Sequence, residues 1–163
     1  MPSAPKCTAN NAGWNDKAVQ EIVRIPKTAN NLGVDTQDNP GPSQQNLNSF
    51  LKQAKIKREN IIIWNTIPWL TLHNENVSPT KENINKGIAI IKTLMPLLKN
   101  ISIVILAGAV ALQTRKFFVQ AYPDVVLLSM PHPSPLSLCR SPSVSEKIKN
   151  TLHQAHLLTL LQK

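Results

Sequence analysis

The sequence predicts an α/β domain of three layers, in which helices cover both faces of a parallel β-sheet. Short apolar runs of the kind found in buried strands occur at residues 61–63, 101–106 and 125–130. The segments between these runs carry apolar residues at a spacing of three and four, which is typical of amphipathic helices. Strands that alternate with helices pair in parallel through right-handed crossovers, and this alternation is the basis of the prediction.

The N-terminal quarter of the chain carries few structural signals. Residues 1–16 are rich in Pro, Asn, Ala and Ser without hydrophobic periodicity, which predicts a poorly ordered arm. Residues 18–25 form either a first strand or one helical turn, and this segment stops at Pro26. Residues 28–43 have a loop composition. Because 163 residues support one ordinary hydrophobic core, residues 17–163 are expected to form a single domain.

Two helices are expected before the second apolar run. The first follows Ser43, a residue type that caps helices, and extends to about Lys55 with its apolar side on the sheet. The second begins near Ser78 and Pro79, where a capping residue is paired with an early proline. Its apolar residues keep helical spacing until Pro96, so this helix is expected to end there.

The C-terminal part of the chain continues the alternation. Small residues at 107–109 allow a helix to start close to the end of the second strand, and this helix is predicted over residues 110–120. The third strand follows, and then a last amphipathic helix that Ser143 or Ser145 caps.

Residues 131–137, with the sequence Pro-His-Pro-Ser-Pro-Leu-Ser, directly follow the third strand. Helix interiors and inner strands exclude proline, so the segment is predicted to be a rigid loop. Such a loop holds His132 in the fixed geometry that a functional site needs, and a proline-rich surface turn is the alternative. Asn65 ends the first buried strand. Because the carboxyl ends of parallel strands open onto one crevice, Asn65 and His132 are expected to converge there.

These two segments resemble the uracil-DNA glycosylase superfamily, which has an apolar strand ending in Asn and a later His-Pro-Ser-Pro-Leu-Ser loop. Here these features are Asn65 and residues 132–137, and the resemblance covers roughly residues 43–163. It implies a four-stranded parallel sheet in the order 2-1-3-4. It also implies hydrolysis of the N-glycosidic bond of deoxyuridine in DNA, after base flipping and without a metal or an organic cofactor. Hypoxanthine and xanthine remain open as alternative bases.

The resemblance assigns Asn65 to substrate binding and His132 to catalysis. The amide of Asn65 offers a donor and an acceptor, which match O4 and N3–H of uracil but not the corresponding groups of cytosine. An asparagine that only caps the strand is the alternative. His132 would donate a hydrogen bond to O2 of the leaving uracil as negative charge develops there, and a neutral imidazole is sufficient for this role.

The same resemblance distributes further roles along the loop. Ser134 joins the substrate-binding residues, and Pro133, Ser137 and Arg140 contact DNA, where hydroxyls, backbone amides and a guanidinium hold phosphates. Leu136 has the character of a wedge that fills the gap left by a flipped nucleotide. A leucine buried in the core is the alternative for Leu136.

An earlier motif of the family departs strongly from its usual pattern here. Residues 21–28 lack the glycine-rich or Asp-Pro pattern, and Arg24 or Ile25 stands where a polar residue would orient water. An isoleucine cannot orient water. No aromatic residue on which a flipped base would stack is evident in residues 28–43. The polar residues that remain candidates for orienting water are Asn30, Asn31 and Asp35.

Charge and composition are consistent with a nucleic-acid partner. The chain carries 18 Lys and Arg against 9 Asp and Glu, a net charge of +9 that suits a polyanion. No apolar run approaches the roughly 20 residues of a membrane span, so we expect no membrane association through such a span. Without a secretory pattern, an intracellular, cytoplasmic protein is expected. Cys7 and Cys139 cannot supply the four ligands of an iron–sulfur cluster.

Two other function classes compete with a monomeric uracil-DNA glycosylase. In the second class the protein keeps the fold but has no catalytic activity. It would then be a DNA-binding or uracil-binding module that has lost the water-activating motif. A general nucleotide-binding α/β protein is the third class, but no glycine-rich phosphate loop follows any predicted strand. Residues 24–28 discriminate between the first two classes.

Overall fold

The computed structural model describes residues 42–69 and 77–162 of the chain. The N-terminal arm (1–16), the segment 18–25, the residues proposed to orient water and most of the loop at 28–43 lie outside the described residues. The first described helix is α2 (Pro42–Gln53), and a short 3-10 helix, η3 (Arg58–Asn60), follows it.

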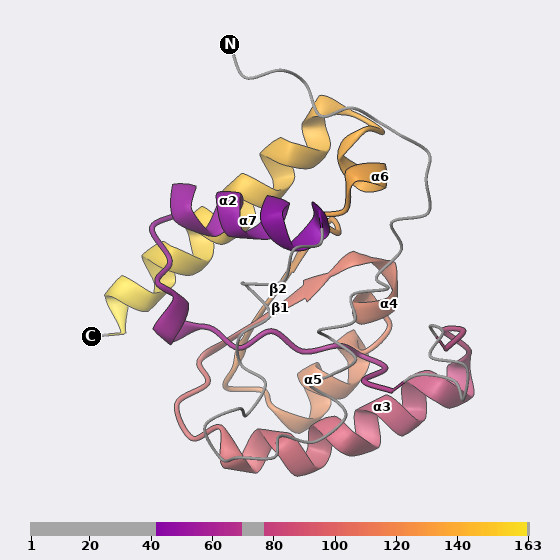
Figure 1. Ribbon diagram of the computed structural model, residues 1–163. Coiled ribbons are helices and arrows are strands. Elements are labelled where there is room, and N and C mark those ends of the chain that lie inside the picture. The colour runs from indigo at the N-terminus through magenta and orange to yellow at the C-terminus, as the bar shows by residue number, and fades with distance from the viewer. Residues whose placement is uncertain (1–41, 70–76, 163) are drawn as a thin grey trace, which may run out of the picture.

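The remaining elements alternate as the sequence predicts (Figure 1). In chain order they are α3 (Lys81–Leu94), η4 (Met95–Leu97), β1 (Ile103–Ala107), α4 (Gly108–Leu112), α5 (Arg115–Ala121), β2 (Val126–Met130), α6 (Pro135–Leu138) and α7 (Pro142–Leu161).

The sheet of the described residues consists of β1 and β2, which pair in parallel from Ile103 opposite Val126 to Ala107 opposite Met130. Two strands joined through the helices α4 and α5 form the βαβ unit that the alternation predicted, so the protein has an α/β fold. The four-stranded sheet in the order 2-1-3-4 stays a prediction.

The expected strand at residues 61–63 is not a strand in the structure. Ile61 has extended dihedrals, with φ −132° and ψ 148°, but the segment pairs with no strand among the described residues. Within the described ranges, the backbone of residues 62–65 makes no hydrogen bond to other backbone groups. An extended chain becomes a strand only when a neighbouring strand supplies donors and acceptors, and the described residues supply none there.

Helices cover the sheet on both faces, because the side chains of β1 alternate between two hydrophobic clusters. Ile105 and Ala107 pack toward a cluster formed by α2, α7 and Met130. Val104 and Leu106 face the other way, toward a cluster with Ile91 of α3 and Phe118 of α5. Figure 1 shows α2 and α7 on one side of the strands and α3 and α5 on the other.

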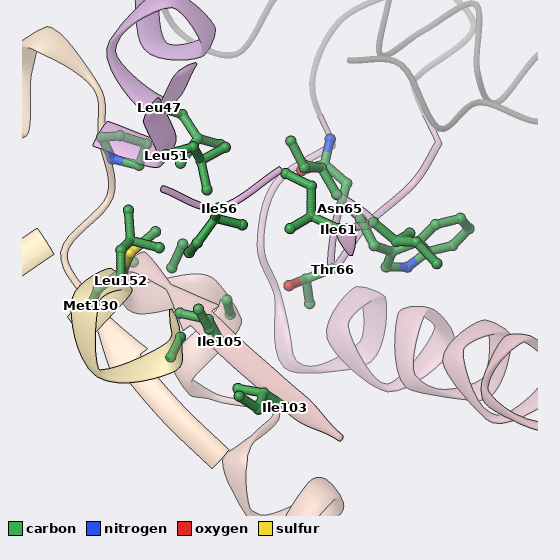
Figure 2. A pocket seen from close by; sticks show the side chains of 18 of the residues that line it. Leu47, Leu51, Ile56, Ile61, Asn65, Thr66, Ile103, Ile105, Met130 and Leu152 are labelled. Carbon is green, nitrogen blue, oxygen red and sulfur yellow. The ribbon is translucent and has the colours of Figure 1, made fainter. Parts of the chain in front are cut away.

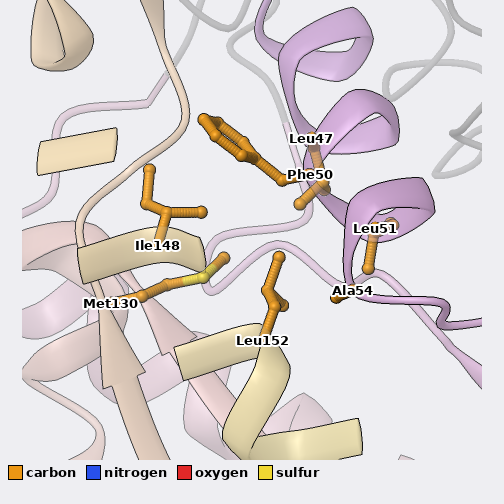
Figure 3. Packing of buried hydrophobic residues seen from close by; sticks show 7 residues of the cluster. All are labelled: Leu47, Phe50, Leu51, Ala54, Met130, Ile148 and Leu152. Atoms are coloured by element: carbon orange, nitrogen blue, oxygen red, sulfur yellow. The ribbon is translucent and has the colours of Figure 1, made fainter. Parts of the chain in front are cut away.

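The core next to the sheet is formed by α2 and α7. Figure 3 shows Phe50 and Leu51 of α2 facing Ile148 and Leu152 of α7, with Met130 between the helices and the sheet. Ile148 is completely buried. This cluster attaches α2 to the end of β2, directly before the loop that carries His132.

One predicted helix is wrong in extent. The helix expected over residues 110–120 is divided into α4 and α5 by a turn at Gln113 and Thr114. The hydroxyl and the amide of Thr114 both donate to the carbonyl of Ala111, at 2.7 and 3.0 Å. The Thr114 side chain is almost fully buried, so the chain turns tightly here to bring it inside.

Three predicted caps are also wrong. Ser43 lies inside α2, and Thr80, not Ser78, caps α3. The cap of α7 is Ser141, whose hydroxyl accepts a hydrogen bond from the amide of Ser143. Pro142 explains the shift, because a proline at the first helical position makes the residue before it the cap.

The predicted loop at 131–137 is correct only in its first half. Residues 131–134 are irregular, but α6 begins at Pro135. Ser134 caps this short helix by accepting a hydrogen bond from the amide of Ser137. A proline at the first helical position does not interrupt a helix, and this explains why Pro135 permits one here.

Candidate functional site

A cavity of about 1210 Å³ lies between residues 61–69, the strand β1 and the loop after β2. Most of its lining is aliphatic, and Figure 2 shows Leu47 and Leu51 of α2, Ile61, and Ile105 of β1 around it. The cavity is larger than the roughly 300–1,000 Å³ of ordinary ligand pockets. Polar side chains also line the cavity, among them Asn65 and Thr66, the loop at His132, and charged residues such as Lys57, Glu59 and Lys99.

Asn65 is the last residue of the extended segment and Thr66 begins the bend that follows, and both are half-buried at the cavity (Figure 2). The turn rests on α3 at Gly87. A Cβ atom at Gly87 would overlap the carbonyl oxygen of Thr66, so a glycine is required for this close approach. Trp64 and Trp69 flank the turn and line the same cavity.

His132 lies two residues beyond the end of β2 and packs against the end of β1. Gly108, the first residue after β1, has φ +88°, a conformation that side chains other than glycine rarely adopt. A Cβ atom at Gly108 would lie 3.0 Å from the Cβ of His132. The two parallel strands therefore end side by side, and the missing side chain of Gly108 leaves room for the imidazole.

The imidazole of His132 is neutral at physiological pH. Burial removes water that would stabilise a charged ring, and it lowers the pKa of His132 from 6.5 to about 4. The backbone amide of Ser134 donates a hydrogen bond of 3.1 Å to Nδ1. Since Nδ1 accepts this bond, the proton of the neutral ring resides on Nε2. The ring is therefore a hydrogen-bond donor through Nε2, which is itself a buried atom.

The hydroxyl of Ser134 donates a hydrogen bond of 3.1 Å to the hydroxyl oxygen of Ser137. Ser134 also caps α6, so its side chain stabilises the loop that holds His132. Both serines line the cavity, as does Pro133, whose ring is fully buried.

Leu136 and Arg140 lie outside the cavity lining, on the surface. The side chain of Leu136 is 71% exposed at the start of α6, which excludes the alternative that this leucine is buried in the core. Leu136 lies four positions after the half-buried His132 in the chain. Arg140 is an exposed residue two positions beyond α6.

Of the predicted site residues, the cavity thus brings together five: Asn65, His132, Pro133, Ser134 and Ser137. Reasoning from the sequence missed the structural importance of Gly87 and of Asn46. A glycine within a helical pattern often has a packing reason, so Gly87 carried a signal. Asn46 carried a weaker signal, because asparagine is unfavourable inside a helix.

Residues 42–69 and 77–162 contain no group of three or more His, Cys, Asp or Glu side chains that could hold a metal ion. In the same ranges, no helix is both long enough and apolar enough to span a bilayer.

Comparison with known proteins identifies the family. The family model of the uracil DNA glycosylase superfamily matches residues 39–157, a range that includes both Asn65 and the loop of His132. Neither the curated proteins nor the solved structures contain a significant match. Because the family model covers well over half of the chain, the protein belongs to the uracil DNA glycosylase superfamily.

Proposed function

We propose that the protein is a uracil-DNA glycosylase that flips uracil out of DNA and hydrolyses its N-glycosidic bond. Membership of the superfamily supports a glycosylase-like function and DNA as the partner. The observation that carries the proposal is the ring of His132, which accepts a hydrogen bond at Nδ1, so that its proton lies on Nε2, and which borders the cavity that Asn65 also lines.

Recognition of the base is the first step. A flipped uracil in the cavity would present O4 and N3–H to the side chain of Asn65, whose amide donates to O4 and whose carbonyl accepts from N3–H. Cytosine has an amino group and an unprotonated N3 at these positions, so both contacts would become repulsive. The aliphatic walls of the cavity would exclude water around the base.

Departure of the base is the second step. The bond between C1′ of the deoxyribose and N1 of uracil breaks, and its electron pair leaves with uracil as an anion whose charge is shared by O2. His132 Nε2–H would donate a hydrogen bond to O2, which stabilises this charge without transferring the proton. Water adds to C1′ and loses a proton, and the products are uracil and an abasic site.

Contacts to DNA would come from the outer side of the same loop. Leu136 would enter the duplex in place of the flipped nucleotide. Arg140 would hold a phosphate beside it, and backbone groups near Pro133 and Ser137 would contribute to positioning the strand. These contacts set the register and leave recognition of the base to Asn65.

A second candidate function is supported by residues 21–28, which lack the usual pattern of the family's first motif. Where a polar residue would orient water, the chain has Arg24 or Ile25. A member of this fold that binds uracil-containing DNA without cleaving it would keep Asn65, His132 and Leu136 and would lack only the attack by water.

Cleavage and binding measured on one preparation separate the two functions. The chain is incubated in excess over DNA containing one uracil, and abasic sites are detected by alkaline strand scission. Matched DNA with thymine is the control, and DNA with hypoxanthine or xanthine tests the alternative bases. Scission at uracil alone supports the glycosylase. Retained binding without scission on any base would establish the silent member instead.

A further inference from the structure

A side chain of α2 reaches the loop that carries His132. Asn46 Nδ2 donates a hydrogen bond of 3.0 Å to the carbonyl oxygen of Pro133, across 87 positions of sequence. Asn46 is half-buried, and its neighbours on α2, Gln44 and Leu47, are buried. The helix is anchored by its packing on α7, so Asn46 projects from a fixed support.

The carbonyl of Pro133 and the amide of Ser134 belong to the same peptide group. One end of this planar unit accepts the hydrogen bond from Asn46, and the other end donates to Nδ1 of His132. Rotation of the peptide plane would break both bonds together. A hydrogen bond to a carbonyl also polarises the peptide and strengthens the bond that its N–H donates.

We propose that Asn46 is a positioning residue that fixes the tautomer of His132 through the peptide group between Pro133 and Ser134. Asn46 holds the peptide so that its N–H points at Nδ1. With Nδ1 occupied as an acceptor, the ring proton is held on Nε2, where the proposed glycosylase needs its donor. The catalytic consequence rests on the proposed function, but the tautomer itself is a property of the free protein.

The alternative tautomer shows why this support matters. If the peptide turned away, Nδ1 could carry the proton, and Nε2 would become an acceptor. An acceptor facing O2 of uracil would oppose the developing negative charge. Proline on both sides of His132 restricts φ but leaves the orientation of the peptide after Pro133 to be set by hydrogen bonds.

The test is nitrogen NMR of the histidine rings in the uncomplexed protein at pH 7, because the chemical shifts of Nδ1 and Nε2 distinguish the two neutral tautomers. The signals of His132 are assigned by their absence in His132→Gln. We expect wild-type His132 to be protonated on Nε2, and Asn46→Ala to show a mixture of both tautomers. Asn46→Asp, which presents a carboxylate that cannot donate, should shift the mixture further.

The matched control is Asn85→Ala, which removes an exposed asparagine from α3 and should leave the His132 signals unchanged. Urea unfolding of each variant shows whether the fold is retained. Should Asn46→Ala not fold, the spectrum of Asn46→Asp supplies the comparison, and protonation of His132 on Nδ1 in the wild type overturns the proposal by itself. An unchanged tautomer in a folded Asn46→Ala protein overturns it as well.

Single-turnover cleavage adds a second readout if the chain is a glycosylase. Asn46→Ala should lower the rate constant about tenfold, as expected for one neutral hydrogen bond, with little change in substrate affinity. In a His132→Ala background the same substitution should cause no further loss. A full tenfold loss in that background would assign Asn46 to another role. Absence of all cleavage would refute the proposed function and leave the NMR result to decide the role of Asn46.

Discussion

His132 combines a proline on each side, a half-buried side chain and a hydrogen bond from the Ser134 amide to Nδ1. Protonation of Nδ1 would place two N–H groups against each other and break this bond. The hydrogen bond at Nδ1 therefore favours the neutral ring in the same direction as burial does. The residue is suited to donate a hydrogen bond from Nε2 and unsuited to deliver a proton at neutral pH.

The pH dependence of cleavage tests this state. Because burial lowers the pKa of His132 to about 4, the single-turnover rate constant should stay constant from pH 8 to about pH 5.5 and fall with an inflection near pH 4. An inflection near pH 6.5 would mean that the ring is exposed. His132→Ala should abolish the inflection and lower the rate by about 10²-fold or more.

Stability should depend on pH in the same direction. The pKa of His132 is about 4 in the folded chain and near 6.5 when unfolded, so the unfolded chain binds more protons between these values. The free energy of unfolding should therefore fall as pH decreases from 6.5 to 4. Urea unfolding midpoints of wild type and His132→Gln should diverge over this range, with the wild type losing more.

Leu136 allows a prediction about duplex DNA. An exposed leucine that fills the space of a flipped nucleotide is needed only where a base stack must be opened. Leu136→Ala should therefore weaken cleavage of double-stranded DNA by roughly tenfold and change cleavage of single-stranded DNA little. Leu97→Ala, at another highly exposed leucine, is the control. Equal losses on both substrates would count against the wedge.

Asn65 and His132 could be selected from the sequence, because each follows an apolar run that ends in a turn. The contribution of Asn46 could not be selected in the same way. Its partner is the backbone carbonyl of Pro133, 87 positions away, and neither an asparagine nor a proline indicates such a hydrogen bond in the sequence. The tautomer of His132 likewise depends on a backbone orientation that the sequence does not encode locally.

Among the elements, α3 positions the turn that carries Asn65. Gly87 allows the helix to touch the carbonyl of Thr66, so the placement of Asn65 depends on a residue outside the cavity lining. Thr80 caps this helix by accepting from the amide of Asn83 at 3.2 Å, which fixes where the helix starts. The position of Asn65 thus depends on the helix α3, whose first residue is fixed by the Thr80 cap.

Gly87→Ala measures that dependence. The added methyl group would collide with backbone and displace the turn, so the variant should lose stability and bind uracil-containing DNA more weakly. Asn85→Ala on the exposed side of the same helix gains helix propensity without a collision and should be stabilised by about 0.5 kcal/mol. Unfolding in urea and DNA affinity are measured for both. A Gly87→Ala protein as stable and as active as Asn85→Ala would contradict the claim that α3 positions Asn65.

Predictions of elements succeeded where hydrophobic periodicity was long and failed where a single residue decided the outcome. The strands β1 and β2 and the helix α3 lie close to their predicted positions. The break before α5 depends on the buried hydroxyl of Thr114, which periodicity cannot reveal. The segment at residues 61–63 has the composition of a strand, but pairing requires a neighbour in space.

At the scale of the whole molecule, net charge should govern association with DNA. The chain has a charge of +9, so cations displaced from DNA phosphates should make binding strongly dependent on salt. The logarithm of the binding constant should fall linearly with the logarithm of salt concentration, with a slope steeper than about −2. Arg140→Ala should reduce the slope by about one unit if Arg140 holds a phosphate. A flat response would argue against phosphate contacts.

The layered α/β arrangement was predictable from the alternation of strands and helices, and the match of the superfamily to residues 39–157 agrees with it. The alternation alone could not predict the strand order of a four-stranded sheet, because that order depends on pairing between segments distant in sequence. The candidate first strand at residues 18–25 lies outside the described residues, so the order 2-1-3-4 stays a prediction.

The most direct test of the account is single-turnover cleavage of DNA containing one uracil, with the chain in excess and with His132→Ala and Asn65→Ala measured beside the wild type. Excess protein removes product release from the measured rate. The account predicts cleavage by the wild type that both substitutions depress, His132→Ala by about 10²-fold or more. Cleavage that neither substitution affects would contradict it, and so would a wild type that binds this DNA but never cleaves it.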